Sequence, residues 1–296
     1  MKATITSIEL KGPLKFFALS ANALNIIKQL KATNYKYFKK IAFYIIVLLS
    51  FISSSINAQN TRLNNYNTIG WYNYFGTFKV SQKFGVHTEY QFRRNEIITK
   101  WQQSLLRVGV NYQLNPKIQF RLGYAWIETF PYGEIPINGM GKDFTEHRLF
   151  QMATITDKVS ILDLSQRFML EQRWVGRYSN ANLTNEDEFP LLNRFRYMFR
   201  MQIPLKGKEI IDKTAYIAIY DEIFIGFGKN VNENIFDQNR VGILIGYRFS
   251  PSIRIEAGYL NQTLQLGREV NNRNVFQHNN GLIINANFNI DLITKK

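Results

Sequence analysis

Apolar and polar side chains alternate at nearly every position between Pro190 and Pro204. One parity holds the apolar side chains Leu191, Phe195, Tyr197, Phe199, Met201 and Ile203. The other parity includes the cationic side chains Arg194, Arg196 and Arg200. A period of two predicts an extended strand with one apolar face and one cationic face. Lipid outside and a wet lumen inside would satisfy both faces, as in a transmembrane β-barrel.

Similar segments recur along the chain, and most are long enough to cross a bilayer when tilted, which takes about 9–11 residues. They lie near residues 68–80, 84–93, 106–113, 118–126, 146–156, 162–174, 191–203, 213–226, 240–249, 253–266 and 281–291. Single-chain bacterial barrels have even strand numbers. We therefore predict an all-β, antiparallel barrel of ten or twelve strands. Either one segment does not span, or Gln59–Asn67 adds another.

The connections between these segments alternate in length. Short ones are expected near 115–117, 157–158 and 250–252, and longer polar ones at 131–145, 176–189, 226–234 and 267–275. This alternation is typical of periplasmic turns and extracellular loops. Four tryptophans lie near predicted strand ends, where interfacial girdles form. They are Trp71, Trp101, Trp126 and Trp174.

The front of the chain has the composition of an export signal. Lysines 36, 39 and 40 precede the apolar run 41–52, and small residues lead to a cleavage site after Ala58. The run is too short for a spanning helix, which needs about 20 residues. We expect residues 1–58 to be a removed leader and 59–296 the barrel domain. Residues 1–35 are unusually long for such a leader, so either translation starts downstream or a long leader is removed whole.

The net charge is +15, from 37 Lys and Arg against 22 Asp and Glu. Residues 1–58 carry eight of the lysines and one acid, so the remaining chain has a net charge of +8. Nucleic-acid binding needs clustered basic patches, whereas these charges are mostly isolated at alternate positions. The chain has no cysteine, which fits an exported protein without disulfides and excludes a lipid-modified cysteine anchor.

The inward parity of the predicted strands carries many charges, which must pair with one another or stay hydrated. If these charges pair with one another, they form an internal salt-bridge network that stabilises a narrow barrel. The excess of arginine also suits a narrow pore that prefers anions. The lumen candidates are Arg148, Arg167, Glu171, Arg173, Arg194, Arg196, Arg200, Glu222 and Arg240.

Three motifs occur in succession on neighbouring predicted strands. They are Thr145–Gln151, Ser165–Arg173 and Asn193–Tyr197, each with charged residues at strand spacing. Their order resembles a family of exported bacterial proteins, the domain of unknown function two-four-nine-zero, found in Bacteroidetes-like Gram-negative bacteria. The resemblance covers about 68–292. It implies an outer-membrane barrel and brings no established activity or catalytic residue.

Two other classes of function remain open. His278 and Asn280 have the lipid-facing parity, an arrangement similar to that of an outer-membrane phospholipase, but Asn280 occupies the position of the nucleophilic hydroxyl. An amide cannot replace that hydroxyl in acyl transfer, so we predict no enzyme. The second class is a ligand-binding module, a soluble periplasmic β-sandwich with a basic ligand site.

No metal or cofactor site is predicted, since the histidines lie on different segments without zinc-ligand spacing. The sequence thus predicts an integral β-barrel of the bacterial outer membrane, either structural or a narrow anion-preferring pore. Its expected partners are outer-membrane lipids and lipopolysaccharide, with small anionic solutes as candidates for passage. Its protein partners are unknown.

Overall fold

The computed structural model describes residues 62–231 and 234–293, which form one closed sheet. Among these residues no helix is long and apolar enough to span a membrane. The eleven strands are β1 (Arg62–Lys79), β2 (Phe84–Asn95), β3 (Lys100–Asn115), β4 (Ile118–Thr129), β5 (Phe144–Val159), β6 (Leu162–Val175), β7 (Leu191–Pro204), β8 (Thr214–Phe227), β9 (Phe236–Ser250), β10 (Ile253–Val270) and β11 (Arg273–Asp291). Each corresponds to one of the eleven alternating segments of the sequence.

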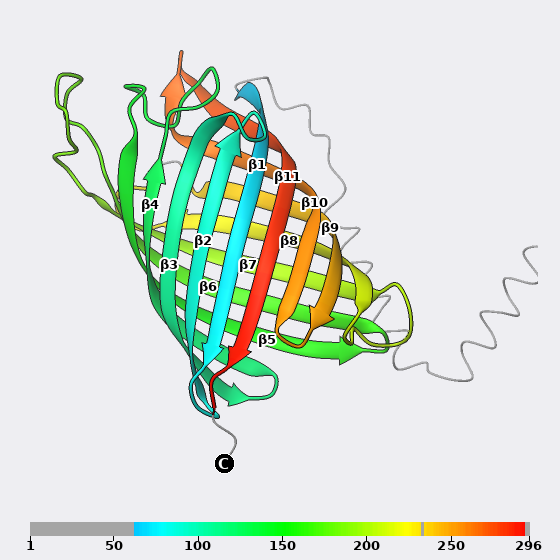
Figure 1. Ribbon diagram of the computed structural model, residues 1–296. Helices are drawn as coiled ribbons and strands as arrows, with labels where there is room; N and C mark the ends of the chain where they lie inside the picture. Colours follow the sequence, from blue (N-terminus) through cyan, green and yellow to red (C-terminus); the bar gives the residue numbers. More distant parts are fainter. Residues whose placement is uncertain (1–61, 232–233, 294–296) are drawn as a thin grey trace, which may run out of the picture. The chain divides into compact units, whose positions relative to one another are not determined.

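The prediction of ten or twelve strands is wrong, because the barrel closes with eleven. Every neighbouring pair is antiparallel except β1 and β11, which pair in parallel from Arg62↔Asn274 to Lys79↔Asp291. Their arrowheads lie at the same end of the barrel in Figure 1. An odd number of up-and-down strands can close only with one parallel pair. Within the described residues, 62–67 form the first part of β1 rather than an additional strand.

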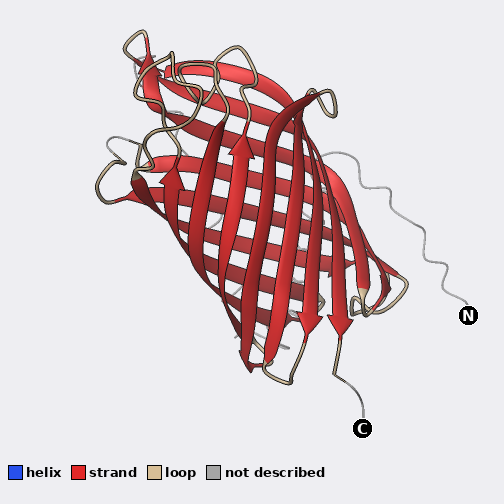
Figure 2. Ribbon diagram, turned by 60° about the vertical axis from the view of Figure 1, so that its left-hand side comes forward, coloured by secondary structure: helices blue, strands red, loops and turns tan. Residues whose placement is uncertain are grey.

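The two ends of the barrel differ, as the connection lengths predict. One end, here called the turn end, carries the tight turns 116–117, 160–161 and 251–252 and the longer connection 205–213. The other, the loop end, carries the connections 130–143 and 176–190 and the described residues 228–231 and 234–235 between β8 and β9 (Figure 2). Arg62 begins β1 at the loop end, whereas β11 ends at the turn end.

One predicted loop, 267–275, is instead a two-residue turn between β10 and β11. Asn271 and Asn272 both have positive φ, at 53° and 55°. Asparagine tolerates this left-handed conformation, and a tight hairpin turn with positive φ at both central residues matches the twist of the flanking strands. β10 and β11 therefore extend as strands up to this two-residue turn.

The barrel has apolar side chains outside and charged side chains inside. Leu122 is 61% exposed and Ile245 is 67% exposed, in the middle of β4 and β9. On β7, Phe195 is exposed while Arg194 and Arg196 are buried. The predicted facing of this strand is therefore confirmed. A single closed sheet is not two stacked sheets, so the β-sandwich alternative is wrong.

The predicted leader, residues 1–58, lies outside the described residues. The same holds for the expected start of the barrel domain at residue 59.

Candidate functional site

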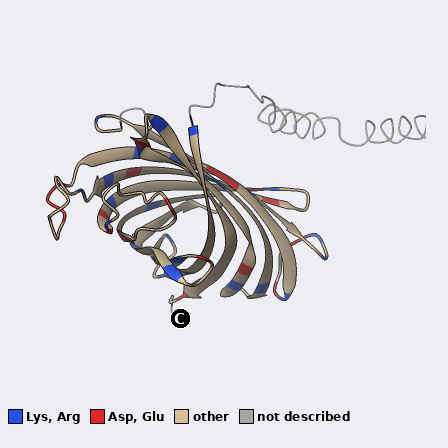
Figure 3. Ribbon diagram, turned by 90° about the horizontal axis from the view of Figure 1, so that it is seen from above, with Lys and Arg blue, Asp and Glu red and all other residues tan. Residues whose placement is uncertain are grey.

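The candidate site is the lumen of the barrel, where charged side chains project from β2 to β10. Figure 3 shows charged positions of both signs along the wall and in the loops. Burying a charge is costly unless it is paired and hydrogen-bonded. Eleven charged side chains in the strands are buried: Glu89, Arg93, Arg107, Glu146, Arg148, Glu171, Arg194, Arg196, Glu222, Asp237 and Glu256.

A continuous ion-pair network joins β5 to β9. It contains four carboxylates and five arginines: Glu146, Glu171, Glu222 and Asp237, with Arg148, Arg167, Arg173, Arg194 and Arg196. Alternation brings all of these side chains except Asp237 to the lumen face of their strands, and the antiparallel register then places the strands' charges side by side. The network ties five neighbouring strands together from inside the barrel.

Glu171 is the central acceptor of this network and is fully buried. Its Oε2 accepts from Arg194 Nε at 2.8 Å, and its Oε1 accepts from Arg196 Nη1 at 2.8 Å. Arg148 Nη1 lies 3.7 Å from the same Oε1. One carboxylate thus faces three guanidinium groups from two neighbouring strands.

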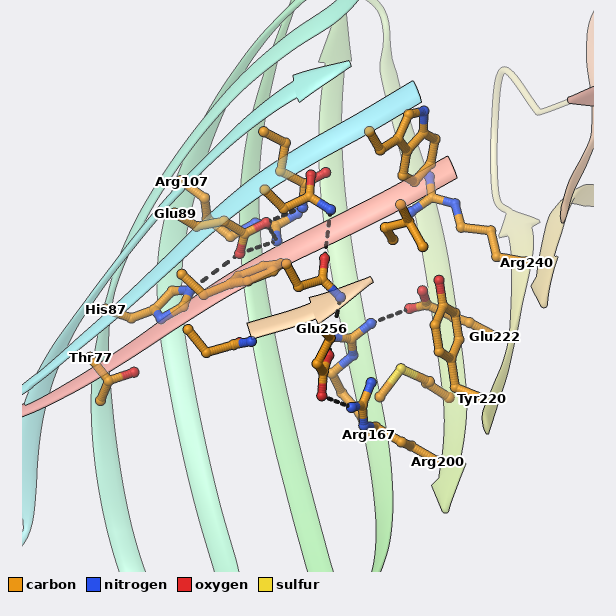
Figure 4. Close-up of a pocket in the computed structure, with 18 of the residues that line it drawn as sticks. Thr77, His87, Glu89, Arg107, Arg167, Arg200, Tyr220, Glu222, Arg240 and Glu256 are labelled. Atoms are coloured by element: carbon orange, nitrogen blue, oxygen red, sulfur yellow. Dashed lines mark hydrogen bonds and ion pairs between the residues drawn. The ribbon is translucent and has the colours of Figure 1, made fainter. Parts of the chain in front are cut away.

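Smaller ion-pair groups lie on other parts of the wall (Figure 4). Glu89 accepts from Arg107 Nη1 at 2.7 and 2.8 Å, and His87 Nε2 lies 3.1 Å from its Oε2. Glu256 pairs with Arg200 and also accepts from the hydroxyl of Tyr216 at 2.7 Å. Carboxylates of the lumen are therefore largely engaged by arginines.

Glycine makes room for the tyrosine that supports Glu256. Tyr216 on β8 lies opposite Gly246 on β9, and a Cβ at Gly246 would lie 2.3 Å from Tyr216 Cζ. No side chain fits at that distance without displacing the ring. Gly246 is thus required for close approach of an aromatic ring to the backbone.

Two cavities occupy the lumen. The turn-end cavity, of about 360 Å³, is lined by nine arginines but only three glutamates. The loop-end cavity, of about 460 Å³, is lined by seven arginines and two acids. Arg93, Arg148 and Arg240 line both. The surroundings of both cavities therefore carry a large excess of positive charge, which attracts anions.

The connection 130–143 folds into the loop end and narrows it. Tyr132 is buried, donates its hydroxyl to Gln277 Oε1 at 2.9 Å and accepts from Asn279 Nδ2 at 3.1 Å. Gln277 Nε2 also donates to the carbonyl of Ile135 at 2.6 Å. Burial raises the pKa of Tyr132, so this phenol keeps its proton at neutral pH.

All nine lumen candidates of the sequence lie inside the barrel. Eight of them line one or both cavities, and Glu171 lies behind them as an acceptor for Arg194 and Arg196. Arg148, Arg167, Arg173, Arg194, Arg196 and Arg200 are paired with carboxylates, whereas Arg240 forms no such pair within the part of the chain described. Whether any of them selects solutes stays a prediction.

Two lumen residues were missed by the alternation pattern. Asp237 belongs by parity to the outer face, but a bulge opposite Phe224 and Ile225 turns both Asp237 and Gln238 inward. Trp71 was expected in a girdle and is instead buried in the lumen. The other three tryptophans are on the outer face or partly exposed.

His278 lies on the outer face, as its parity predicts. Asn280, two residues on, binds Tyr259 and Asn261 and supplies no hydroxyl. The cross-strand neighbour Thr263 does place its Oγ1 3.4 Å from His278 Nδ1, and Asn64 Oδ1 lies 3.1 Å from Nε2. Among the residues described, no group of three or more His, Cys, Asp or Glu side chains is arranged to hold a metal ion.

These observations define the class of protein, a closed β-barrel with an apolar exterior and an arginine-rich lumen. Residues 68–273 match the model of a family described as "Protein of unknown function (DUF2490)", and the chain belongs to that family. This confirms the resemblance found in the sequence.

A solved structure, the "NanC porin structure in rhombohedral crystal form", aligns with 13% identity and a TM-score of 0.40. The alignment covers 74% of this chain and 97% of that chain. No curated protein matches the chain.

Proposed function

We propose that this protein is an integral barrel of the bacterial outer membrane whose lumen is a narrow pore for small anions. The exposed apolar side chains of the strands support the location, because a bilayer solvates a surface of this kind and water does not. Residues 1–58 would serve as the export leader and be removed. The loop end would then face the outside, with lipopolysaccharide around it.

The excess of arginine around the turn-end cavity carries the proposal of anion preference. Five of its nine arginines pair with carboxylates of the lumen. The other four have no ion pair within the described residues: Arg93, Arg121, Arg240 and Arg254. A purely structural network needs near-neutrality, because unpaired buried charge is destabilising. Mobile anions from solution would supply the missing charge and lower the barrier to their own passage.

Planar-bilayer recording with the purified protein tests this proposal. Under a potassium chloride gradient, we expect small conductance steps and a reversal potential displaced toward that of chloride. The variant Arg254→Gln, which removes a lumen charge with no ion pair in the described chain, should reduce the displacement. The matched control Arg94→Gln, on the outer side of β2, should leave it unchanged. A silent bilayer would favour the purely structural role.

The contacts of His278 favour a second candidate, hydrolysis of lipids at the outer leaflet. A hydroxyl, an imidazole and an amide oxygen lie in sequence, as a nucleophile, a base and its orienting group would. The 3.4 Å contact of Thr263 is long for an activated nucleophile. Release of fatty acid from phospholipid vesicles that is lost in both His278→Ala and Thr263→Val would establish this function; no release in the wild type would exclude it.

A further inference from the structure

Trp71 holds two arginines at the junction of the two cavities. The Cζ of Arg93 lies 3.8 Å from the centroid of the indole, and the Cζ of Arg240 lies 4.8 Å from it. The indole Nε1 donates to Gln102 Oε1 at 2.7 Å, which fixes the plane of the ring. Cation–π contact and this hydrogen bond orient guanidinium groups from β2 and β9 around one ring from β1.

Neither arginine has a carboxylate partner among the described residues. Arg93 donates to the amide oxygens of Gln91 and Gln103, and Arg240 Nε donates to Gln238 Oε1 at 3.0 Å. A neutral amide orients a guanidinium but does not neutralise it. In contrast, Arg194 and the other arginines of the network each contact at least one carboxylate. Two positive charges thus share one aromatic ring without a counter-charge.

The position of the pair makes it a site that solutes must meet. Arg93 and Arg240 line both cavities, and the third residue common to both, Arg148, is already engaged by Glu146. A solute that moved from one cavity to the other would therefore meet two guanidinium groups that have no carboxylate partner in the described chain. Guanidinium presents planar N–H donors that match the two oxygens of a carboxylate or a phosphate.

We infer that Arg93 and Arg240, oriented by Trp71, form a binding site for an oxyanion group, the carboxylate or phosphate of a small solute. The inference deepens the proposed pore, on which the route of the solute rests, but binding itself does not require conduction. The site is distinct from the ion-pair network because its two cations lack internal partners. It prefers oxyanions to chloride because two oxygens can accept from one planar guanidinium.

Phosphate binding to the purified, detergent-solubilised full chain tests the site by isothermal titration, with acetate and chloride as parallel probes. We expect wild-type protein to bind phosphate more tightly than acetate or chloride. Arg93→Gln and Arg240→Gln should each weaken phosphate binding by about tenfold or more, since each removes a charged donor. Arg240→Lys keeps the positive charge without the planar guanidinium group, so its phosphate affinity should lie between those of wild type and Arg240→Gln.

Arg94→Gln is the matched control. Arg94 neighbours Arg93 in sequence but donates to the carbonyls of Ile98 and Thr99 at the loop end, so its loss should leave phosphate affinity unchanged. Folding of each variant is checked by heat-modifiable gel mobility. If one of the two glutamine variants does not fold, the phosphate affinity of the other tests the site. Wild-type protein that binds neither phosphate nor acetate, or unchanged affinity in a folded glutamine variant, would overturn the site.

The same preparations separate this inference from the proposed pore. Chloride currents without binding of phosphate or acetate would overturn the oxyanion site and leave the pore. Phosphate binding with a silent bilayer would overturn the pore and leave the site. If both hold, phosphate should reduce the chloride current in wild type and in Arg94→Gln, but less in Arg240→Gln.

Discussion

The substitution Glu171→Gln removes one negative charge from the centre of the ion-pair network while it keeps the shape of the side chain. Glu171 is fully buried and accepts from Arg194 and Arg196 at 2.6–2.8 Å, with Arg148 at 3.7 Å. Arg194 and Arg196 keep one other carboxylate each, Asp237 and Glu222. Arg148 likewise keeps Glu146. The variant would therefore leave each of the three guanidinium groups with one carboxylate and with a neutral amide in place of the acceptor that they share.

The expected loss of stability follows from burial. Breaking a buried ion pair by removing one partner costs about 3–5 kcal/mol, because the other charge stays uncompensated. Each arginine keeps one other carboxylate and glutamine retains a carbonyl acceptor, so we expect the lower end of that range, about 3 kcal/mol. Glu96 offers the contrast, since its pair with Lys100 is exposed and such pairs contribute about 0–1 kcal/mol.

The free energy of unfolding of both variants is measured by reversible unfolding in guanidinium chloride. The protein is refolded into lipid vesicles, and unfolding is followed by tryptophan fluorescence. Glu171→Gln should lower the free energy of unfolding by about 3 kcal/mol. Glu96→Gln should change it by less than about 1 kcal/mol. Equal effects of the two substitutions, or a Glu171→Gln variant as stable as wild type, would refute the view that the network stabilises the barrel from inside.

Three further predictions concern other parts of the barrel. Tyr132→Phe should destabilise the inward loop by about 1–3 kcal/mol and raise conductance, because two buried partners lose their hydrogen bonds. In the wild type, burial raises the pKa of Tyr132, so the hydrogen bonds of its hydroxyl stabilise the inward loop fully below about pH 10. This stabilisation is lost only as the pH rises through the folded-state pKa of Tyr132. Conductance should therefore be constant from pH 7 to 9. Because the chain has no cysteine, Asn182→Cys should react with an impermeant maleimide on intact cells and Ser252→Cys only after lysis; the reverse pattern would invert the orientation. Gly246→Ala should cost about 1–3 kcal/mol through displacement of the Tyr216 ring, measured by the same unfolding assay, and no change would mean that the ring yields freely.

The prediction of ten or twelve strands came from the even-strand rule, although the alternation pattern itself contained eleven segments. All eleven alternating segments are strands, and the rule assumes that neighbouring strands are antiparallel all the way round. Here β1 and β11 pair in parallel over their whole length, so an odd number closes. No local property of Arg62–Lys79 reveals its partner, because both parallel and antiparallel strands alternate in the same way.

The sequence by itself determined the facing of nearly every strand residue. Side-chain direction in a strand is a local backbone property with a period of two, so Phe195 outward and Arg194 inward follow from neighbouring positions alone. The arginine-rich character of the lumen follows in the same way. Long-range pairing decided the rest: that Glu171 meets Arg194 and Arg196, that a bulge turns Asp237 inward, and that Tyr132 enters the lumen. These depend on register, closure and loop path, which arise from contacts between residues far apart in the chain.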